Sequence, residues 1–192
     1  MVIGVLALQG GFAEHIEVLS QLGVEETRRV RVPQDLEGIE GLVIPGGESS
    51  VIDKLARSLG LAVPLSQAIE EGLPVFATCA GLIYLGQVDN PAPGQRSLGC
   101  LDAVVRRNAF GRQTDSFDTR VRVFDQIEAD VSFIRAPEII SWGPAVEVTA
   151  QVAERVVGVK QGFIHAYAFH PESAGETRLH EAWLGEIRGG QE

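Results

Sequence analysis

The sequence has few cysteines, an excess of acidic over basic residues and no long apolar run, and each feature excludes a class of protein. Two cysteines in 192 residues do not form the framework of a disulfide-stabilised secreted domain. Sixteen Lys and Arg against 26 Asp and Glu give a formal net charge of −10, which argues against nucleic acid and anionic membrane surfaces as partners. No apolar run approaches the roughly 18 residues of a membrane span.

The amino terminus, MVIGVLALQGG, lacks the basic segment that opens a secretory signal peptide. We therefore expect a cytoplasmic protein, in which Cys79 and Cys100 are free thiols rather than a disulfide. The length and the 45% hydrophobic content favour a single domain over residues 1–192.

Short β-type runs alternate with amphipathic segments in the first half of the chain. Residues 2–8 form a nearly continuous apolar run, typical of a strand covered on both faces, and residues 12–23 show helical spacing. Further strands are expected at 28–32, 41–44 and 74–77, and further helices at 64–72 and through Ile52 to Leu59, with Ser49 or Ser50 as the cap. This alternation predicts a parallel sheet with helices on both faces.

The second half consists mainly of short β-like runs separated by turn residues. The runs lie at 101–107, 116–124, 133–137, 138–142, 145–152, 155–161 and 163–169. They predict an antiparallel extension of the sheet. A last helix is expected at 177–187, and the Pro- and Gly-containing segment 89–97 is expected to be an exposed loop.

Cys79 lies between small residues where an expected strand meets an expected helix. A nucleophile on such a sharp turn needs small neighbours, here Ala77 and Gly81, because the backbone is tightly folded. The following helix places its free N–H groups and its dipole near the sulfur, which favours the thiolate. A buried structural cysteine is the alternative.

A cysteine nucleophile needs a base and a group that orients the base. His170 ends an expected strand and has Glu172 two residues later. Residues i and i+2 of an extended segment project to the same side, so we expect Glu172 to accept a hydrogen bond from His170; a polar turn is the alternative. His15 and His180 lie on amphipathic helices, where we expect solvated or half-buried structural positions, and we expect a structural role for His165 within a strand.

Residues 45–50 (PGGESS) form a glycine-rich turn at a strand end. The turn has neither the G-x-x-x-x-G-K-[ST] pattern nor a lysine, so it does not indicate a nucleotide P-loop. Consecutive glycines instead allow backbone N–H groups to approach a ligand and stabilise a developing oxyanion. An ordinary strand-to-helix turn is the alternative.

Six segments occur in the order found in a known family. They are LALQGGFAEH (6–15), PGGESS (45–50), ATCAGLI (77–83), RRNAFGRQTDSF (106–117), FIRAP (133–137) and FHPE (169–172). Over residues 2–187 the chain thus resembles the glutaminase subunits of pyridoxal 5'-phosphate synthases, a family of class I (triad) glutamine amidotransferases. The cysteine, glycine and His-Pro-Glu segments belong to class I amidotransferases broadly, whereas LQGGFAEH and RNAFGRQ narrow the match to this subunit.

The resemblance implies a three-layer, flavodoxin-like α/β fold with a mostly parallel central sheet, helices on both faces and an antiparallel extension. It implies that Cys79 attacks the side-chain amide of L-glutamine, His170 relays the proton and Glu172 orients the imidazolium, so that glutamate and ammonia form through a cysteinyl thioester. The implied oxyanion hole is made by the backbone N–H groups of Gly47 and Ala80. The implied glutamine-binding residues are Gly47, Glu48, Ser49, Arg107, Ile134 and Arg135.

The resemblance also implies a partner. Ammonia released into bulk water would be protonated, and the family delivers it to the synthase (lyase) subunit, a barrel enzyme that builds pyridoxal phosphate. The expected assembly is a hetero-oligomer in which the glutaminase subunit is poorly active alone. Gln9, in the loop after the first strand, is the expected contact with the synthase, because the LQGG segment distinguishes this subunit from other amidotransferases. No cofactor and no metal are expected.

The chain departs from the family pattern at Ala77, where the usual G-x-C-x-G frame has glycine. Ser50 stands where threonine is commoner, and Ser173 stands where leucine commonly follows the carboxylate. A γ-glutamyl hydrolase has a similar cysteine turn and is the alternative enzyme, while the His-Pro-Glu pair argues against a DJ-1-like protein. Outside enzymes, the alternative is a catalytically silent subunit that only docks on a partner.

Overall fold

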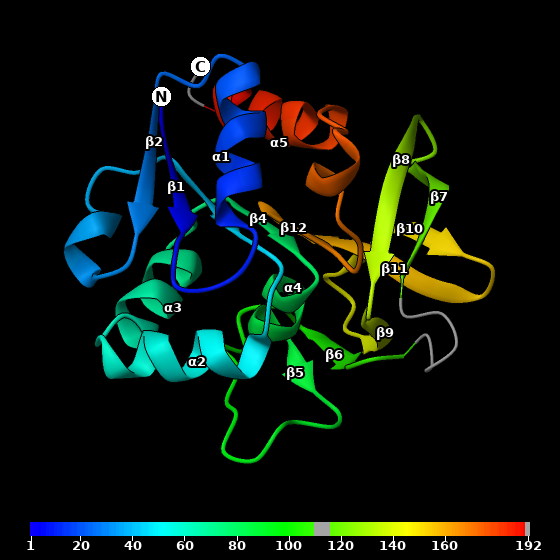
Figure 1. Ribbon diagram of the computed structural model, residues 1–192, viewed down its shortest axis with the longest axis horizontal. Coiled ribbons are helices and arrows are strands. Elements are labelled where there is room, and N and C mark those ends of the chain that lie inside the picture. Colours follow the sequence, from blue (N-terminus) through cyan, green and yellow to red (C-terminus); the bar gives the residue numbers. More distant parts are fainter. Residues whose placement is uncertain (110–115, 191–192) are drawn as a thin grey trace.

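The computed structural model of the protein describes residues 1–109 and 116–190, which form a layered α/β structure (Figure 1). The strands are β1 (Val2–Leu6), β2 (Glu26–Val30), β3 (Gly41–Ile44), β4 (Val75–Thr78), β5 (Gln87–Val88), β6 (Ala103–Arg106), β7 (Ser116–Val123), β8 (Ile127–Ile134), β9 (Glu138–Trp142), β10 (Glu147–Val152), β11 (Arg155–Gln161) and β12 (Ile164–Tyr167). The helices are α1 (Phe12–Gln21), α2 (Ser49–Ser58), α3 (Ala62–Glu70), α4 (Ala80–Leu85) and α5 (Arg178–Gly189), with short 3-10 helices η1 (Pro33–Leu36) and η2 (Glu172–Ala174).

The strands join in one sheet whose main path, within the described residues, is β2-β1-β3-β4-β12-β11-β10-β7-β8. The strands from β2 to β12 along this path pair in parallel. From β12 to β8 each neighbouring pair is antiparallel. β5, β6 and β9 form a branch that joins the path at β11. The predicted parallel sheet with an antiparallel extension is therefore confirmed.

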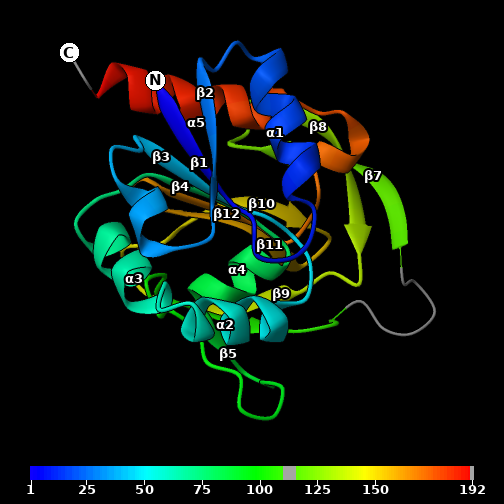
Figure 2. The same cartoon turned by 60° about the vertical axis from the view of Figure 1, so that its left-hand side comes forward.

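Helices cover both faces of the parallel part of the sheet. α1 and α5 lie on one face, and α2, α3 and α4 lie on the other (Figures 1 and 2). Because both faces are covered, every residue of β3, β4 and β12 is buried. This explains why these short strands are mostly apolar on both faces, with Thr78 and His165 as buried polar exceptions.

Helix α5 is held on the sheet by aromatic packing. Trp183 is 1% exposed, and its ring centroid lies 5.7 Å from that of Phe76 in β4. Burial of a side chain such as Phe76 contributes roughly 1.5–3 kcal/mol. The packing fixes α5 over β4, and with it His180, whose ring centroid is 4.2 Å from that of Phe76.

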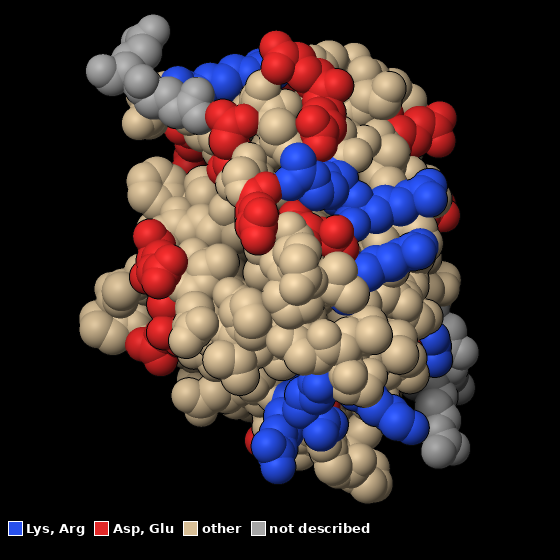
Figure 3. All heavy atoms as spheres, turned by 90° about the vertical axis from the view of Figure 1, so that its left-hand side faces the viewer, with Lys and Arg blue, Asp and Glu red and all other residues tan. Residues whose placement is uncertain are grey.

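The outer strand of the parallel part, β2, carries charged side chains. Arg28 and Arg29 lie on it and Arg31 follows it, with Arg29 stacked 6.0 Å from the ring centroid of Phe12. Figure 3 views this side of the molecule and shows basic and acidic side chains mixed on it. Charged side chains on an edge strand hinder its pairing with a strand of another molecule.

Two local predictions from the sequence are wrong. The strand expected at 133–137 is the end of β8, which begins at Ile127; it stops at Ile134 because Arg135 has a φ of +43°. Glu48, rather than Ser49 or Ser50, caps α2, and its carboxylate accepts from the Ser50 backbone N–H at 3.4 Å. Among the described residues, no helix is long and apolar enough to cross a membrane.

Candidate active site

Cys79 occupies a sharp turn between β4 and α4, as its small neighbours predict. Its backbone has φ +48° and ψ −100°, a conformation that residues other than glycine rarely adopt. A Cβ on Gly81 would lie 2.2 Å from the carbonyl oxygen of Ile44, so only glycine fits there. Ala77 is fully buried within β4 and does not have a positive φ, so its methyl group is accommodated and the turn forms.

The predicted contact between His170 and Glu172 is present, with Nδ1 2.7 Å from Oε1. The reason given for it by the sequence is wrong. Pro171 has helical dihedral angles (φ −67°, ψ −36°), and Glu172 begins the 3-10 helix η2 rather than continuing a strand. The carboxylate thus meets the imidazole across a tight helical turn, and both side chains are buried.

Burial and charge act in opposite directions on these two groups. Burial alone would lower the pKa of His170, but hydrogen bonding and charge from Cys79 and Glu172 outweigh it and raise the pKa to about 10. Burial alone would raise the pKa of Glu172, but His15 and His170 outweigh it and hold the pKa far below its usual range. The site therefore favours an imidazolium at His170 beside an ionised carboxylate.

The glycine-rich turn after β3 packs against this pair. A Cβ on Gly46 would lie 2.1 Å from Cε1 of His170, and Gly47 has φ +154°, which favours glycine. Thr78 Oγ1 accepts the Gly46 backbone N–H at 3.0 Å, so the turn is tied to the end of β4. Ala80, the other residue of the implied oxyanion hole, is the first residue of α4 and is 1% exposed. Its side chain does not line the cavity described next.

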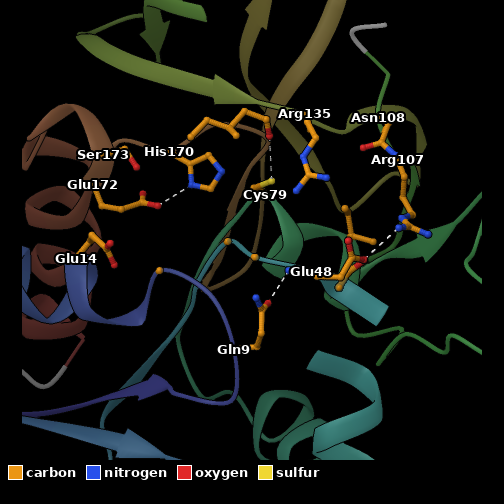
Figure 4. Close-up of a pocket in the computed structure, with 16 residues that line it drawn as sticks. Gln9, Glu14, Glu48, Cys79, Arg107, Asn108, Arg135, His170, Glu172 and Ser173 are labelled. Atoms are coloured by element: carbon orange, nitrogen blue, oxygen red, sulfur yellow. Dashed lines mark hydrogen bonds and ion pairs between the residues drawn. The ribbon is translucent and has the colours of Figure 1, made fainter. Parts of the chain in front are cut away.

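A cavity of about 300 Å³ opens in front of Cys79 (Figure 4). The three residues of the predicted triad and Gln9 line it. It is also lined by every residue in the implied glutamine-binding set: Gly47, Glu48, Ser49, Arg107, Ile134 and Arg135. Segments that lie far apart in the sequence therefore meet at one cavity, near the ends of the parallel strands.

One wall of the cavity carries a pair of opposite charges. Arg107 Nη2 donates to Glu48 Oε1 at 3.1 Å, and Arg107 Nη1 donates to Gln95 Oε1 at 3.3 Å. Gln95 Nε2 in turn donates to Ser49 Oγ at 2.9 Å. A carboxylate and a guanidinium side by side suit a zwitterionic ligand, which carries both an ammonium and a carboxylate group.

Gln9 reaches from the loop after β1 to the same turn. Its Oε1 accepts the Glu48 backbone N–H at 2.6 Å, and a Cβ on Gly47 would lie 2.4 Å from that oxygen. The loop after β1 is therefore in direct contact with the turn that carries the implied oxyanion donor.

Several residues of the site were not identified from the sequence. Glu14, Asn108 and Ser173 line the cavity, and Gln95 supports it from the segment expected to be only an exposed loop. Glu14 and Asn108 lie within recognised segments and Ser173 directly follows one, which is the signal that could have found them. Residues 110–115 of the segment RRNAFGRQTDSF lie outside the described residues.

The expected positions of two other histidines are wrong. His15 and His180 are completely buried rather than solvated or half-buried. They lie on α1 and α5, which pack on the same face of the sheet (Figure 2). His15 Nδ1 lies 2.9 Å from His180 Nε2. His165 is also buried, with Nε2 3.1 Å from Glu186 Oε2, and it does not line the cavity.

Both cysteines are free thiols, as the sequence predicts. Cys100 is half-buried, 3.4 Å from Ser66 Oγ, and burial raises its pKa. In the part of the chain that the structure describes, no group of three or more His, Cys, Asp or Glu side chains is arranged to hold a metal ion.

Comparison with known proteins places this chain in a family. The model of the SNO glutamine amidotransferase family matches residues 5–188. Pyridoxal 5'-phosphate synthase subunit PdxT of Corynebacterium diphtheriae is 72% identical over 187 residues, covering 97% of this chain and 100% of the relative. The protein of the same name from Cutibacterium acnes is 52% identical, covering 96% of each chain.

Solved structures agree with this placement. A crystal structure of a glutamine amidotransferase superposes with a TM-score of 0.91 at 45% identity, covering 98% of this chain and 100% of that one. The structure of PurLQS from Thermotoga maritima, with a TM-score of 0.68, 18% identity and 97% and 98% coverage, shares the fold. The chain therefore belongs to the SNO glutamine amidotransferase family.

Proposed function

We propose that this protein hydrolyses L-glutamine to glutamate and ammonia and supplies the ammonia to the synthase subunit of a pyridoxal 5'-phosphate synthase. Its membership of a glutamine amidotransferase family and its 72% identity to a pyridoxal 5'-phosphate synthase subunit support this function. The observation that carries the chemistry is the arrangement of Cys79, His170 and Glu172 at one cavity.

The first half of the reaction forms a thioester. The sulfur of Cys79 attacks the side-chain amide carbon of glutamine, and the C=O electron pair moves onto oxygen. Backbone N–H groups of Gly47 and Ala80 donate to this oxyanion. When the intermediate collapses, the C–N bond breaks and the imidazolium of His170 gives its proton to the departing nitrogen, which leaves as ammonia. Glu172 holds the imidazole in place through Nδ1.

The second half regenerates the enzyme. Water gives a proton to His170 Nε2 and attacks the thioester carbon through the same type of oxyanion. The C–S bond then breaks, and glutamate leaves while Cys79 returns to its starting state. We assign recognition of the two charged ends of glutamine to Glu48 and Arg107, which face the cavity, with Ser49, Ile134 and Arg135 completing the binding site.

The synthase subunit is the proposed acceptor of the ammonia, and Gln9 is the proposed contact with it. Gln9 accepts a hydrogen bond from the backbone N–H of Glu48. A partner that binds the loop after β1 would therefore directly affect the glycine-rich turn that carries Gly47. Substitution Gln9→Ala is therefore expected to weaken activation by the synthase; unchanged binding and unchanged activation would remove Gln9 from the interface. We also propose a cytoplasmic location, which suits the two free thiols.

Ammonia release from glutamine, measured with and without the synthase subunit of the same organism, tests the function. We expect release with the native protein in the complex, none with Cys79→Ala, and native release with Cys100→Ala, the matched control at the other cysteine. Release by Cys79→Ala would exclude the thioester mechanism. Cleavage of γ-glutamyl peptides in preference to glutamine would favour a γ-glutamyl hydrolase, and full synthase activity on glutamine with Cys79→Ala would favour a docking subunit.

A further inference from the structure

A buried histidine pair lies next to Glu172 of the proposed triad and does not line the cavity. His15 Nε2 is 3.4 Å from Glu172 Oε1 and 3.1 Å from Thr78 Oγ1, and its Nδ1 is 2.9 Å from His180 Nε2. Both histidines and Thr78 are 0% exposed. No step of the proposed reaction uses these side chains.

The contacts decide which nitrogen of His15 carries a proton. Nε2 faces a carboxylate oxygen, which only accepts hydrogen bonds, so a lone pair on Nε2 would point at a negative charge inside the protein. A proton on Nε2 replaces this repulsion with attraction: Nε2 is then hydrogen-bonded to Thr78 Oγ1 at 3.1 Å and makes an ion-pair contact with the Glu172 carboxylate at 3.4 Å. His15 therefore donates from Nε2 whether its Nδ1 is bare or protonated.

His180 supports the same assignment. When His15 Nδ1 is bare, it accepts the Nε2–H of His180, and the second nitrogen of His180 is then a bare acceptor. That nitrogen, Nδ1, has no partner in the described part of the chain. A buried acceptor without a partner is tolerated more often than a buried N–H without one, so this arrangement satisfies the cluster best.

The carboxylate of Glu172 depends on few contacts. Its Oε1 accepts a hydrogen bond from His170 Nδ1 at 2.7 Å and lies 3.4 Å from His15 Nε2. Its Oε2 has no hydrogen-bond partner within the described residues. The orientation of the carboxylate is therefore set at a single oxygen, which both imidazoles contact.

We propose that His15 is a positioning residue for this enzyme: its Nε2–H holds Glu172 in the orientation that aligns His170 with Cys79. The proposal rests on the proposed glutaminase function for its kinetic consequence. His15 touches neither the cavity nor Cys79; it acts through Glu172. Thr78 extends the same connection, because its Oγ1 contacts His15 Nε2 and also accepts the Gly46 N–H of the glycine-rich turn.

Nitrogen NMR of the protein labelled with 15N-histidine tests the geometry without any activity measurement. We expect the His15 signals to show a protonated Nε2, and we expect that proton to shift when Glu172 is changed to Ala. A bare Nε2 on His15 at neutral pH would overturn the proposal.

Steady-state kinetics of glutamine hydrolysis in the complex with the synthase subunit test the consequence. His15→Leu is expected to lower kcat about 10–100-fold with little change in KM, the range typical of residues that orient a site residue. The matched control is His165→Leu, which removes another buried histidine paired with a glutamate and is expected to keep native kcat. In a Glu172→Ala background, His15→Leu is expected to change kcat less than about twofold, because its target is gone.

The outcomes separate positioning from a general structural role. An equal fold-loss in the native and Glu172→Ala backgrounds, or native kcat for His15→Leu, would overturn the proposal. If His15→Leu fails to fold, the pair His15→Gln and His15→Asn replaces it: the Gln amide reaches the position of Nε2 and the Asn amide does not. Higher kcat for Gln than for Asn supports the proposal, and equal or lower kcat for Gln contradicts it. Absence of glutaminase activity in the native complex would refute the proposed function instead, and the NMR result would still decide the geometry.

Discussion

Gly46 and His170 are in direct contact: a Cβ on Gly46 would lie 2.1 Å from Cε1 of the imidazole and 2.9 Å from Nδ1. The imidazole thus occupies the space that a side chain at residue 46 would fill. Because Glu172 holds the same ring through Nδ1, the ring has no room to yield without weakening that hydrogen bond. The glycine-rich turn therefore does more than expose N–H groups; it also makes room for the proposed base.

Substitution Gly46→Ala is expected to displace His170 and lower kcat for glutamine hydrolysis about 100-fold, because a displacement of about 1 Å in a catalytic group has an effect of this size. The control is Gly185→Ala, at an exposed position of α5 where a Cβ meets no atom within 4 Å. It should keep native kcat and raise stability by roughly 0.5–1 kcal/mol. Native kcat for Gly46→Ala would contradict the contact.

The pH dependence of kcat/KM should reveal the raised pKa of His170. The imidazolium is the form that protonates the departing amide nitrogen, which leaves as ammonia, so activity is lost when His170 deprotonates, at a pH near 10 rather than near 6.5. Glu172→Gln removes one of the groups that raise this pKa, so the alkaline fall should move to lower pH. The loss of kcat should be smaller than in Cys79→Ala, since the carboxylate orients rather than attacks. An alkaline fall at the same pH in both proteins would contradict this interpretation.

The parts of the site that could be predicted from the sequence are those set by local backbone chemistry. Small residues around Cys79 predict a sharp turn because larger side chains would not fit there. At Gly81, for example, a Cβ would lie 2.2 Å from the carbonyl oxygen of Ile44. The apolar runs predict buried parallel strands because both faces are covered. Local patterns singled out Cys79, His170 and Glu172, and the resemblance supplied their proposed roles and the proposed glutamine-binding residues. All of these residues line one cavity.

The parts that could not be predicted depend on how distant elements pack. Helical spacing shows that His15 and His180 lie on amphipathic helices, but it does not show that α1 and α5 share a face of the sheet, which is what buries both imidazoles. Gln95 joins the site because its loop folds back over Ser49, a contact that a loop pattern does not encode. Pro171 is compatible with strand and helix alike, so the helical turn before Glu172 was missed.

Ala77, the departure from the usual glycine, gives a third prediction. Its Cβ is buried inside β4 and its φ is not in the glycine-favouring region, so alanine does not strain the backbone of the turn. Substitution Ala77→Gly should leave kcat within about twofold of native and should lower stability by roughly 0.5–1 kcal/mol, because glycine has more conformational entropy to lose on folding. Thermal denaturation and steady-state kinetics measure both. A large gain in kcat would mean that the methyl group impairs the native site.

The stability of the fold between pH 7 and pH 5 provides the last prediction. Burial, together with the nearby His15, lowers the pKa of His180 from 6.5 to about 3. Below pH 6.5 the unfolded chain binds a proton at His180 that the native protein does not, so stability falls as the pH drops from 6.5 toward 3. His165, whose pKa burial also lowers, acts in the same direction. The raised pKa of His170 makes stability depend on pH only above pH 6.5. The lowered pKa of Glu172 makes it depend on pH only below the ordinary carboxyl pKa of 4.5.

Between pH 7 and pH 5, His180 alone should lower the free energy of unfolding by about 2 kcal/mol, since each pH unit between the two pKa values contributes about 1.4 kcal/mol. His180→Gln cannot be protonated, so it should lose this part of the pH dependence while His165 retains its own. Urea denaturation at both pH values measures the difference, with Glu181→Gln, at the exposed neighbouring position in α5, as the control. If His180→Gln and the native protein lost equal stability on acidification, His180 would have to be protonated in the folded state, and the hydrogen bond that it donates to His15 would need a different assignment.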